Sequence, residues 1–435
     1  MRVSHIAGGV LLAAAAGAAG FAALAWQPEI EPVEPPARAA FDQAEIAEGA
    51  KLAALGNCLQ CHTAPGGKPF AGGYPLETPF GTIHGTNITP DPETGIGTWS
   101  AEAFRRAMAE GVGRSGEHLY PGFPYDHFTR VTERDNRALY AYLMTREPVR
   151  AEAPPNRLPL PLTFRPLLAG WKLLFLEAGE YRPDPERSDE WNRGAYLAEG
   201  LAHCGACHTP RNALGAREAG REFAGGFSEG WYAPALDRDS AAPVPWTRDA
   251  LFDYLRTGVS EDHAVASGPM APVVRNLSDV PDADIRAIAT YVADRMGAPD
   301  GPAPAPPATP PPAPVARAGG EERGQEQGRA AAIYAGACAT CHEPGGPLQF
   351  QAPVALDRAT SLAQPNPSNA IRAILHGVET PDAAAQPLMP GFANALTDAQ
   401  VAELTAWLRT RFSGGPAWDD LEAEVAEARS GRSAE

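Results

Sequence analysis

All six cysteines of this 435-residue chain fall into three copies of one motif, Cys-x-x-Cys-His. Two thiols three positions apart lie on one helical turn, where both can bond the vinyl groups of one haem. The residue that follows then directs its imidazole at the iron. A single Cys-x-x-Cys also occurs in redox dithiols and zinc sites. Three copies, each followed at once by histidine, instead predict three covalently bound haem c groups. The expected thioether positions are Cys58, Cys61, Cys204, Cys207, Cys338 and Cys341.

The three motifs belong to longer repeats of about 90–110 residues, a normal domain size. A segment of small residues precedes each motif, and a helix ending in Gly-Val follows it. An amphipathic helix with an aromatic residue comes last. The Gly-Val pairs start at Gly111, Gly258 and Gly377. The aromatic residues of the last helices are Tyr142, Tyr291 and Trp407. This pattern predicts a mostly α-helical chain of three small domains in tandem, each built around a haem.

Each repeat resembles a class I cytochrome c domain, in which the first and last helices cross at a small residue. The resemblance implies that Gly49, Gly194 and Gly328 lie at these crossings. An ordinary helical glycine costs about 1 kcal/mol relative to alanine, so a packing role explains the three glycines better.

Composition indicates where the domains begin and end. We expect cytochrome c domains at residues 41–150, 188–298 and 321–412. Residues 299–320 are rich in Pro and Ala, which predicts an extended, semi-rigid linker. Residues 151–187 are also Pro-rich, but their many Leu and Phe side chains predict a connector packed on the first two domains. Residues 413–435 are expected to form a polar tail that starts as a helix.

The motif histidines His62, His208 and His342 are the expected proximal iron ligands. The sixth ligand in this fold is usually a methionine on the loop before the last helix. Met270 and Met389 each lie twelve residues after the glycine of a Gly-Val pair. Because the chain has only six methionines, this shared position predicts iron ligation rather than ordinary core packing. His/Met ligation raises the haem potential.

The first repeat departs from this pattern, because Phe123 stands twelve residues after Gly111. His127 lies on the same loop and is the first candidate for the sixth ligand, while His118 is a weaker one. An open or water-ligated iron behind Phe123 remains an alternative. Met108 and Met144 lie outside this loop and are expected in the core. The histidines expected at the surface or beside a ligand are His84, His203, His263 and His376.

Residues 1–26 predict an export signal or a membrane anchor. No charged residue occurs in the twenty-one positions from Ile6 to Trp26. That length is long for the apolar core of a cleaved signal and sufficient to cross a bilayer. The many Ala and Gly residues favour a cleaved signal, whereas the length and Trp26 favour an anchor, so both remain open. Either one places the rest of the chain in the periplasm, associated with the periplasmic face of the inner membrane if the anchor is kept.

The formal net charge of −17 argues against a nucleic-acid partner, because phosphate binding needs a basic surface. The sequence also lacks the usual signatures of a substrate-oxidising site. There is no dinucleotide fingerprint after a strand, no His-Glu-x-x-His, and no cysteine outside the three motifs. We therefore expect no catalytic residues and no enzymatic activity of the chain by itself.

The three motifs, together with Asn87–Asp91 and Leu119–Pro121, resemble the tri-haem cytochrome c subunits of periplasmic membrane-bound dehydrogenases. The resemblance covers residues 41–412. Subunits that serve alcohol dehydrogenases usually carry Met at the position of Phe123. The segment Phe123–Phe128 is more similar to the cytochrome partners of nicotinate- or isoquinoline-type molybdenum hydroxylases.

This resemblance implies a role in a respiratory chain. The chain would take electrons from a molybdopterin, flavin or quinoprotein dehydrogenase and pass them to ubiquinone or to a downstream cytochrome or oxidase. Two other roles stay open. One is an electron-donor subunit of a terminal oxidase, and the other is a haem enzyme or ligand sensor with an open iron in the first repeat.

Overall fold

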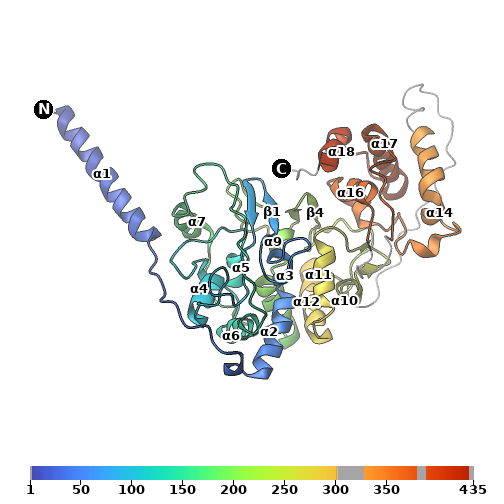
Figure 1. The fold of residues 1–435 in the computed structure, drawn as a ribbon. Helices are drawn as coiled ribbons and strands as arrows, with labels where there is room; N and C mark the ends of the chain where they lie inside the picture. The colour runs from blue at the N-terminus through green and yellow to red at the C-terminus, as the bar shows by residue number, and fades with distance from the viewer. Residues whose placement is uncertain (1, 300, 302–327, 380–387, 431–435) are drawn as a thin grey trace. The chain divides into compact units, whose positions relative to one another are not determined.

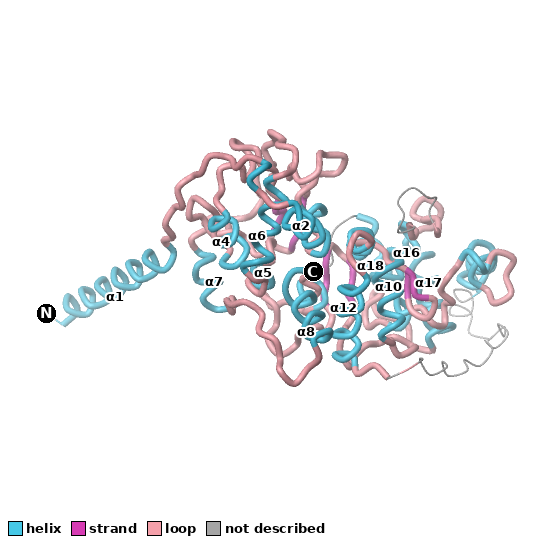
Figure 2. The backbone as a smooth tube through the Cα atoms, turned by 90° about the horizontal axis from the view of Figure 1, so that it is seen from below, coloured by secondary structure: helices cyan, strands magenta, loops and turns pink. Residues whose placement is uncertain are grey.

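The computed structural model describes residues 2–299, 301, 328–379 and 388–430. Helices dominate the described chain, and the strands form short two-stranded hairpins (Figures 1 and 2). The chain divides into two units. Unit 1 contains Met1–Arg182 and Glu199–His203, and unit 2 contains Pro183–Ala198 and Cys204–Glu435. The predicted Pro/Ala linker lies almost entirely outside the described residues.

Unit 1 holds the first repeat. Its helices are α1 (Arg2–Ala25), η1 (Arg38–Ala40), α2 (Gln43–Leu55), α3 (Cys58–Cys61), α4 (Ala101–Glu110), α5 (Tyr125–Phe128), α6 (Glu133–Met144) and α7 (Leu167–Phe175). Strands β1 (Pro75–Thr78) and β2 (Gly81–His84) form its antiparallel hairpin. The side chains of Asp42, Ser100 and Thr132 accept backbone N–H groups at the starts of α2, α4 and α6. These caps explain where the main helices of the unit begin.

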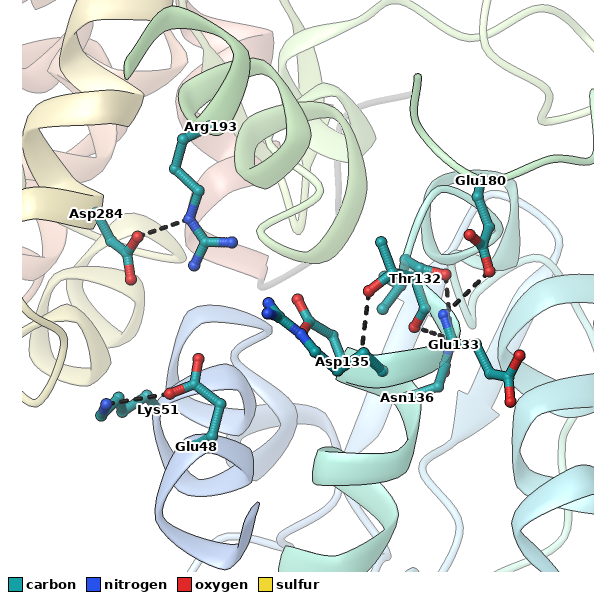
Figure 3. Close-up of polar contacts among 11 residues, drawn as sticks. Glu48, Lys51, Thr132, Glu133, Asp135, Asn136, Glu180, Arg193 and Asp284 are labelled. Atoms are coloured by element: carbon teal, nitrogen blue, oxygen red, sulfur yellow. Dashed lines mark hydrogen bonds and ion pairs between the residues drawn. The ribbon is translucent and has the colours of Figure 1, made fainter. Parts of the chain in front are cut away.

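Helices α2 and α6 cross at Gly49, as the sequence predicts. A Cβ atom at Gly49 would lie 1.9 Å from the carbonyl oxygen of Ala138, so only glycine permits this backbone contact. Figure 3 shows the start of α6, where Thr132 caps the helix and Glu180 accepts the backbone N–H of Glu133. These two contacts fix the residue at which α6 begins.

Unit 2 holds the other two repeats except for Glu199–His203, which belong to unit 1. The second contains α8 (Asp189–Tyr196), α9 (Gly205–His208), α10 (Arg248–Thr257), α11 (Met270–Leu277) and α12 (Asp282–Met296). The π-helical turn η2 (Leu197–Leu201) follows α8 directly. Its strands are β3 (Gly226–Ser228), β4 (Trp231–Ala233), β5 (Val259–Ser260) and β6 (Ala264–Val265). Helices α8 and α12 cross at Gly194, where a Cβ would lie 1.9 Å from the Ala287 carbonyl oxygen. The prediction for Gly194 is confirmed.

The third repeat starts with helical residues 328–333. The elements that follow are η3 (Tyr334–Cys338), α14 (Ala339–His342), η4 (Gln349–Gln351), α15 (Thr360–Ala363), α16 (Ser368–His376), α17 (Asp398–Leu408), η5 (Arg409–Ser413) and α18 (Leu421–Ser430). The prediction for Gly328 is wrong, because a Cβ there would have no heavy atom of the described residues within 4 Å. The first and last helices of this repeat meet instead through the rings of Tyr334 and Trp407, whose centroids are 5.0 Å apart.

The predicted Gly-Val turns are confirmed in all three repeats. Helices α4, α10 and α16 end at Gly111, Gly258 and Gly377, and all three glycines have positive φ. A side chain is unfavourable in this backbone region, which explains why glycine ends each helix.

The connector and the tail differ in how they pack. Arg157 pairs with Thr82, and Tyr181 N donates to Arg130 O, so residues 151–182 of the connector belong to unit 1. Residues 183–187 belong to unit 2, where Asn192 Nδ2 of the second repeat donates to the Asp184 carbonyl oxygen at 2.8 Å. In the tail, α18 is amphipathic rather than wholly polar, because Val425 is fully buried and the helix packs on α16 and α17. Within the described residues, no helix is long and apolar enough to cross a membrane.

Candidate haem-binding sites

The backbone holds each Cys-x-x-Cys-His motif on a single helical turn. In the first two repeats, the residue before the first cysteine has a left-handed backbone, with φ of 50° at Asn57 and 39° at His203. This conformation ends the preceding helix, so that the turns α3 and α9 start in a new direction. In the third repeat, η3 runs directly into α14 without such a residue.

Two proximal histidines have a fixed ring orientation. The Nδ1 atom of His62 donates to the Thr86 carbonyl oxygen at 2.6 Å, and that of His208 donates to the Pro234 carbonyl oxygen at 2.6 Å. A proton on Nδ1 leaves the Nε2 lone pair available for a metal. Burial also lowers the pKa of both imidazoles, which favours the neutral form that ligates iron.

His342 lacks this hydrogen bond. Its Nδ1 atom is buried and has no hydrogen-bond partner among the described residues. Burial lowers the pKa of His342, as it does for the other two motif histidines. The third imidazole is therefore neutral but is oriented by packing alone.

The thiols are not tuned for disulfide exchange. Burial raises the pKa of Cys58 and of Cys204 to about 12, and that of Cys338 to about 11. The attacking cysteine of a redox dithiol instead has a lowered pKa, because the thiolate is the nucleophile. The raised pKa values of these three thiols favour haem attachment over a redox dithiol.

The third repeat brings its expected ligands to one cavity. His342, Met389 and Cys338 line it together, and nearly all other lining residues are apolar. These are Ala337, Leu356, Ser361, Leu362, Ala370, Ala373, Ile374, Phe392, Leu396, Leu404 and Leu408. An imidazole and a thioether in an apolar lining, beside an attachment thiol, fit a haem c with His/Met ligation. Two backbone hydrogen bonds between Val378 and Met389 hold Met389 beside the end of α16.

Three other methionines, at positions 108, 144 and 270, lie in described helices. Met270 is half-buried at the first residue of α11, after the β5–β6 hairpin, and its iron ligation stays a prediction. Met108 and Met144 are each 4% exposed and lie in the core of the first repeat, as expected.

In the first repeat, the two histidine candidates for the sixth iron ligand differ in their hydrogen bonds. His127, on α5, is 1% exposed, and its Nδ1 donates to the Glu199 carbonyl oxygen at 2.7 Å. Both ring nitrogens of His118 are engaged, since Nε2 donates to Ala25 O and Nδ1 accepts from Lys172 Nζ, each at 2.9 Å. These contacts favour His127 over His118, and the iron ligation of His127 stays a prediction. The ring of Phe123 packs against Phe128, with centroids 5.2 Å apart.

Several residues that shape these sites are not evident from the motifs alone. Thr63 and Thr209 directly follow the proximal histidines, and their hydroxyls accept the backbone N–H groups of Phe70 and Phe223. Each phenylalanine then packs edge-on against the aromatic residue of the last helix in its repeat. The shared Cys-His-Thr and Phe-Ala-Gly-Gly sequences are the signal for this arrangement, and Glu343 replaces the threonine in the third repeat.

His263 is not a surface residue. It is 1% exposed and stacks on Trp246, with ring centroids 3.6 Å apart and planes 11° apart. Burial lowers the pKa of His263 to about 4, so its ring is neutral at physiological pH. Its burial inside unit 2 could not be predicted, because no periodic pattern distinguishes it from His84, His203 and His376.

Known proteins support the same assignment. The cytochrome c family model matches residues 46–147 and 328–411. The fructose dehydrogenase cytochrome subunit of Gluconobacter japonicus is 36% identical, with 92% of this chain and 86% of that protein covered. The gluconate 2-dehydrogenase cytochrome c subunit of Pantoea cypripedii is also 36% identical, with 90% of this chain and 91% of that protein covered.

A nicotinate dehydrogenase polypeptide of Pseudomonas putida is 47% identical over 94% of this chain, but the chain spans only 34% of that protein. Cytochrome c domains carry covalently bound haem c, which agrees with the motif geometry. The chain thus belongs to the family of cytochrome c subunits of dehydrogenases.

Proposed function

We propose that the chain is a tri-haem cytochrome that carries electrons from a partner periplasmic dehydrogenase to ubiquinone or to a downstream cytochrome or oxidase. The observation that carries the proposal is the cavity that Cys338, His342 and Met389 line together, because it gathers an attachment thiol and both expected axial ligands of one repeat. The same motif in all three repeats extends that assignment to three domains in tandem. Haem c supplies reversible one-electron transfer when it is bound.

The residues of the chain hold and tune these sites. His62, His208 and His342 offer neutral imidazoles, and carbonyl oxygens fix the first two in the ligating tautomer. Met270 and Met389 offer thioethers, which favour the reduced state and suit transfer toward an acceptor. The apolar lining of the cavity in the third repeat keeps water away from His342 and Met389.

For the partner, we favour a molybdenum hydroxylase of the nicotinate or isoquinoline type. The segment Phe123–Phe128 supports this choice, as does the similarity to a polypeptide named for nicotinate dehydrogenase. Other relatives are named for fructose, gluconate and alcohol dehydrogenases, so a flavin or quinoprotein dehydrogenase is the alternative partner. We place the protein on the periplasmic face of the inner membrane, with residues 1–26 as a signal peptide or an anchor.

The first experiment is purification of the full chain from its own membranes in mild detergent. Intact mass should show three haem c additions, and a dehydrogenase should co-migrate whose substrate reduces all the haems. The matched control is the double variant Cys338→Ser and Cys341→Ser, which should lose one haem and keep two. Fewer than three haems in the wild type, or co-migration with oxidase subunits and no dehydrogenase, would contradict the proposal.

A further inference from the structure

Helix α16 of the third repeat is hydrogen-bonded to strand β4 of the second. Asn369 Oδ1 accepts the Tyr232 backbone N–H at 3.0 Å, and Asn369 Nδ2 donates to the Tyr232 carbonyl oxygen at 2.8 Å. One side chain thus satisfies both backbone groups of a single residue, as a neighbouring strand would. This reciprocal pair fixes the position of α16 along β4.

A buried cation strengthens the same contact. Arg372, one turn further along α16, is 7% exposed, and its Nε donates to the Gly230 carbonyl oxygen at 2.6 Å. Gly230 has φ of 77°, a backbone conformation that favours glycine, and a Cβ there would meet the guanidinium group of Arg372. A buried guanidinium is costly unless it is hydrogen-bonded, which makes this docking geometry specific.

On the second-repeat side, β4 leads directly to the proximal histidine. Pro234 follows β4, and its carbonyl oxygen accepts the Nδ1 proton of His208. The backbone that Asn369 holds therefore lies two positions before the carbonyl that orients the expected iron ligand.

On the third-repeat side, α16 forms a wall of the haem cavity. Ala370, which directly follows Asn369, lines this cavity together with His342 and Met389. Ala373 and Ile374 line it from the next turn of the same helix. The residues that touch β4 and those that face the cavity therefore share one short helix.

We propose that the β4–α16 contact is the docking surface through which electrons pass between the second and third haem sites, with Asn369 as its positioning residue. This inference rests on the proposed function. Electron tunnelling weakens less through covalent and hydrogen bonds than across gaps. The route from His208 to Ala370 is continuous, through Pro234, Tyr232 and Asn369.

Other contacts between the two repeats do not replace this route. Arg358 pairs with Asp262, and Thr360 N donates to the His263 carbonyl oxygen at 2.9 Å. These contacts add to docking, but they join neither β4 nor α16. Loss of the Asn369 contact should therefore slow electron transfer between the two sites, even if the contacts of Arg358 and Thr360 keep the repeats partly associated.

The test uses the full-length holoprotein with a protease site placed within residues 302–318. After cleavage, the wild-type pieces should co-elute, detected by haem absorbance. Asn369→Leu removes both hydrogen bonds and leaves the Tyr232 groups unpaired, so the dissociation constant of the pieces should rise about tenfold or more. Pulse radiolysis of the uncut proteins should show slower electron equilibration between the two sites in the same variant.

Asn366→Leu is the matched control. Asn366 lies just before the same helix and accepts the Ser368 N–H within its own repeat, so association and transfer should stay at the wild-type values. If Asn369→Leu fails to fold, Arg372→Gln tests the same surface. Unchanged association and unchanged transfer in the contact variants would overturn the inference, as would immediate separation of the wild-type pieces. Fewer than three haems in the wild type would instead overturn the proposed function.

Discussion

The Nδ1 atom of His127 donates a hydrogen bond to the carbonyl oxygen of Glu199 at 2.7 Å. His62 and His208 make the same kind of bond to Thr86 and Pro234, at 2.6 Å each. A carbonyl can only accept, so each of the three rings carries its proton on Nδ1 and can ligate through Nε2. His127 therefore has the tautomer of an axial ligand, although it lies outside any Cys-x-x-Cys-His motif.

The first prediction concerns His127. His127→Met should replace bis-histidine by His/Met ligation at the first haem, which raises its potential. The long-wavelength sulfur-to-iron absorption band should gain intensity, and a redox titration should show one of three midpoints moved upward. An unchanged spectrum and unchanged midpoints would remove His127 from the ligand set.

His118→Met is the control for that experiment. Because both ring nitrogens of His118 are already bonded, to Ala25 and to Lys172, this variant should leave all three haem spectra unchanged. A new sulfur band in this variant would show that the sixth ligand of the first haem comes from position 118 instead.

The second prediction concerns the two methionines. Met270→Ala and Met389→Ala should each remove part of the long-wavelength sulfur band and lower one midpoint potential. Met144→Ala removes a methionine of equal size from the core of the first repeat. It should leave the band intact and lower the free energy of unfolding by about 2–5 kcal/mol. A band that survives either of the first two substitutions would exclude that methionine as a ligand.

Residues whose chemistry depends on spacing could be predicted from the sequence. The motif turns, the helices that end in Gly-Val and the crossings at Gly49 and Gly194 follow from local pattern and repeat alignment. The position of Met389 in its repeat predicts a place beside His342, and it lines the same cavity.

Residues whose role depends on tertiary contacts could not be predicted from the sequence. Gly328 aligns with the other crossing glycines, yet the third repeat closes through aromatic rings, so alignment alone misplaces the crossing. Asn369 and Arg372 bind backbone carbonyls of residues 137 and 142 positions away, and no local pattern encodes such partners. The burial of His263 likewise depends on where Trp246 lies in space.

The third prediction is a pH dependence that arises from His263. Burial lowers its pKa in the folded state from 6.5 to about 4. Between these values the unfolded chain binds a proton that the folded chain does not, so the free energy of unfolding falls as the pH falls from 6.5 to 4. The loss of unfolding free energy attributable to His263 should reach about 3 kcal/mol at pH 4.

His263→Phe keeps an aromatic ring against Trp246 and removes the titrating group. Urea unfolding of both proteins at several pH values should therefore show a shallower acid dependence for the variant. Parallel curves for wild type and variant would show that other groups cause the acid sensitivity of unit 2.

The last prediction compares one substitution at three aligned positions. In Gly49→Ala and Gly194→Ala, the new methyl group would lie 1.9 Å from a backbone carbonyl oxygen, so the crossing helices must separate. Each variant should lose about 1–3 kcal/mol or more of unfolding free energy, as overpacked cores do. Gly328→Ala meets no atom within 4 Å and should be neutral, or gain up to about 1 kcal/mol from helix propensity. Thermal unfolding followed by circular dichroism separates these cases. A loss at position 328 as large as at position 49 would mean that the third repeat closes at its glycine after all.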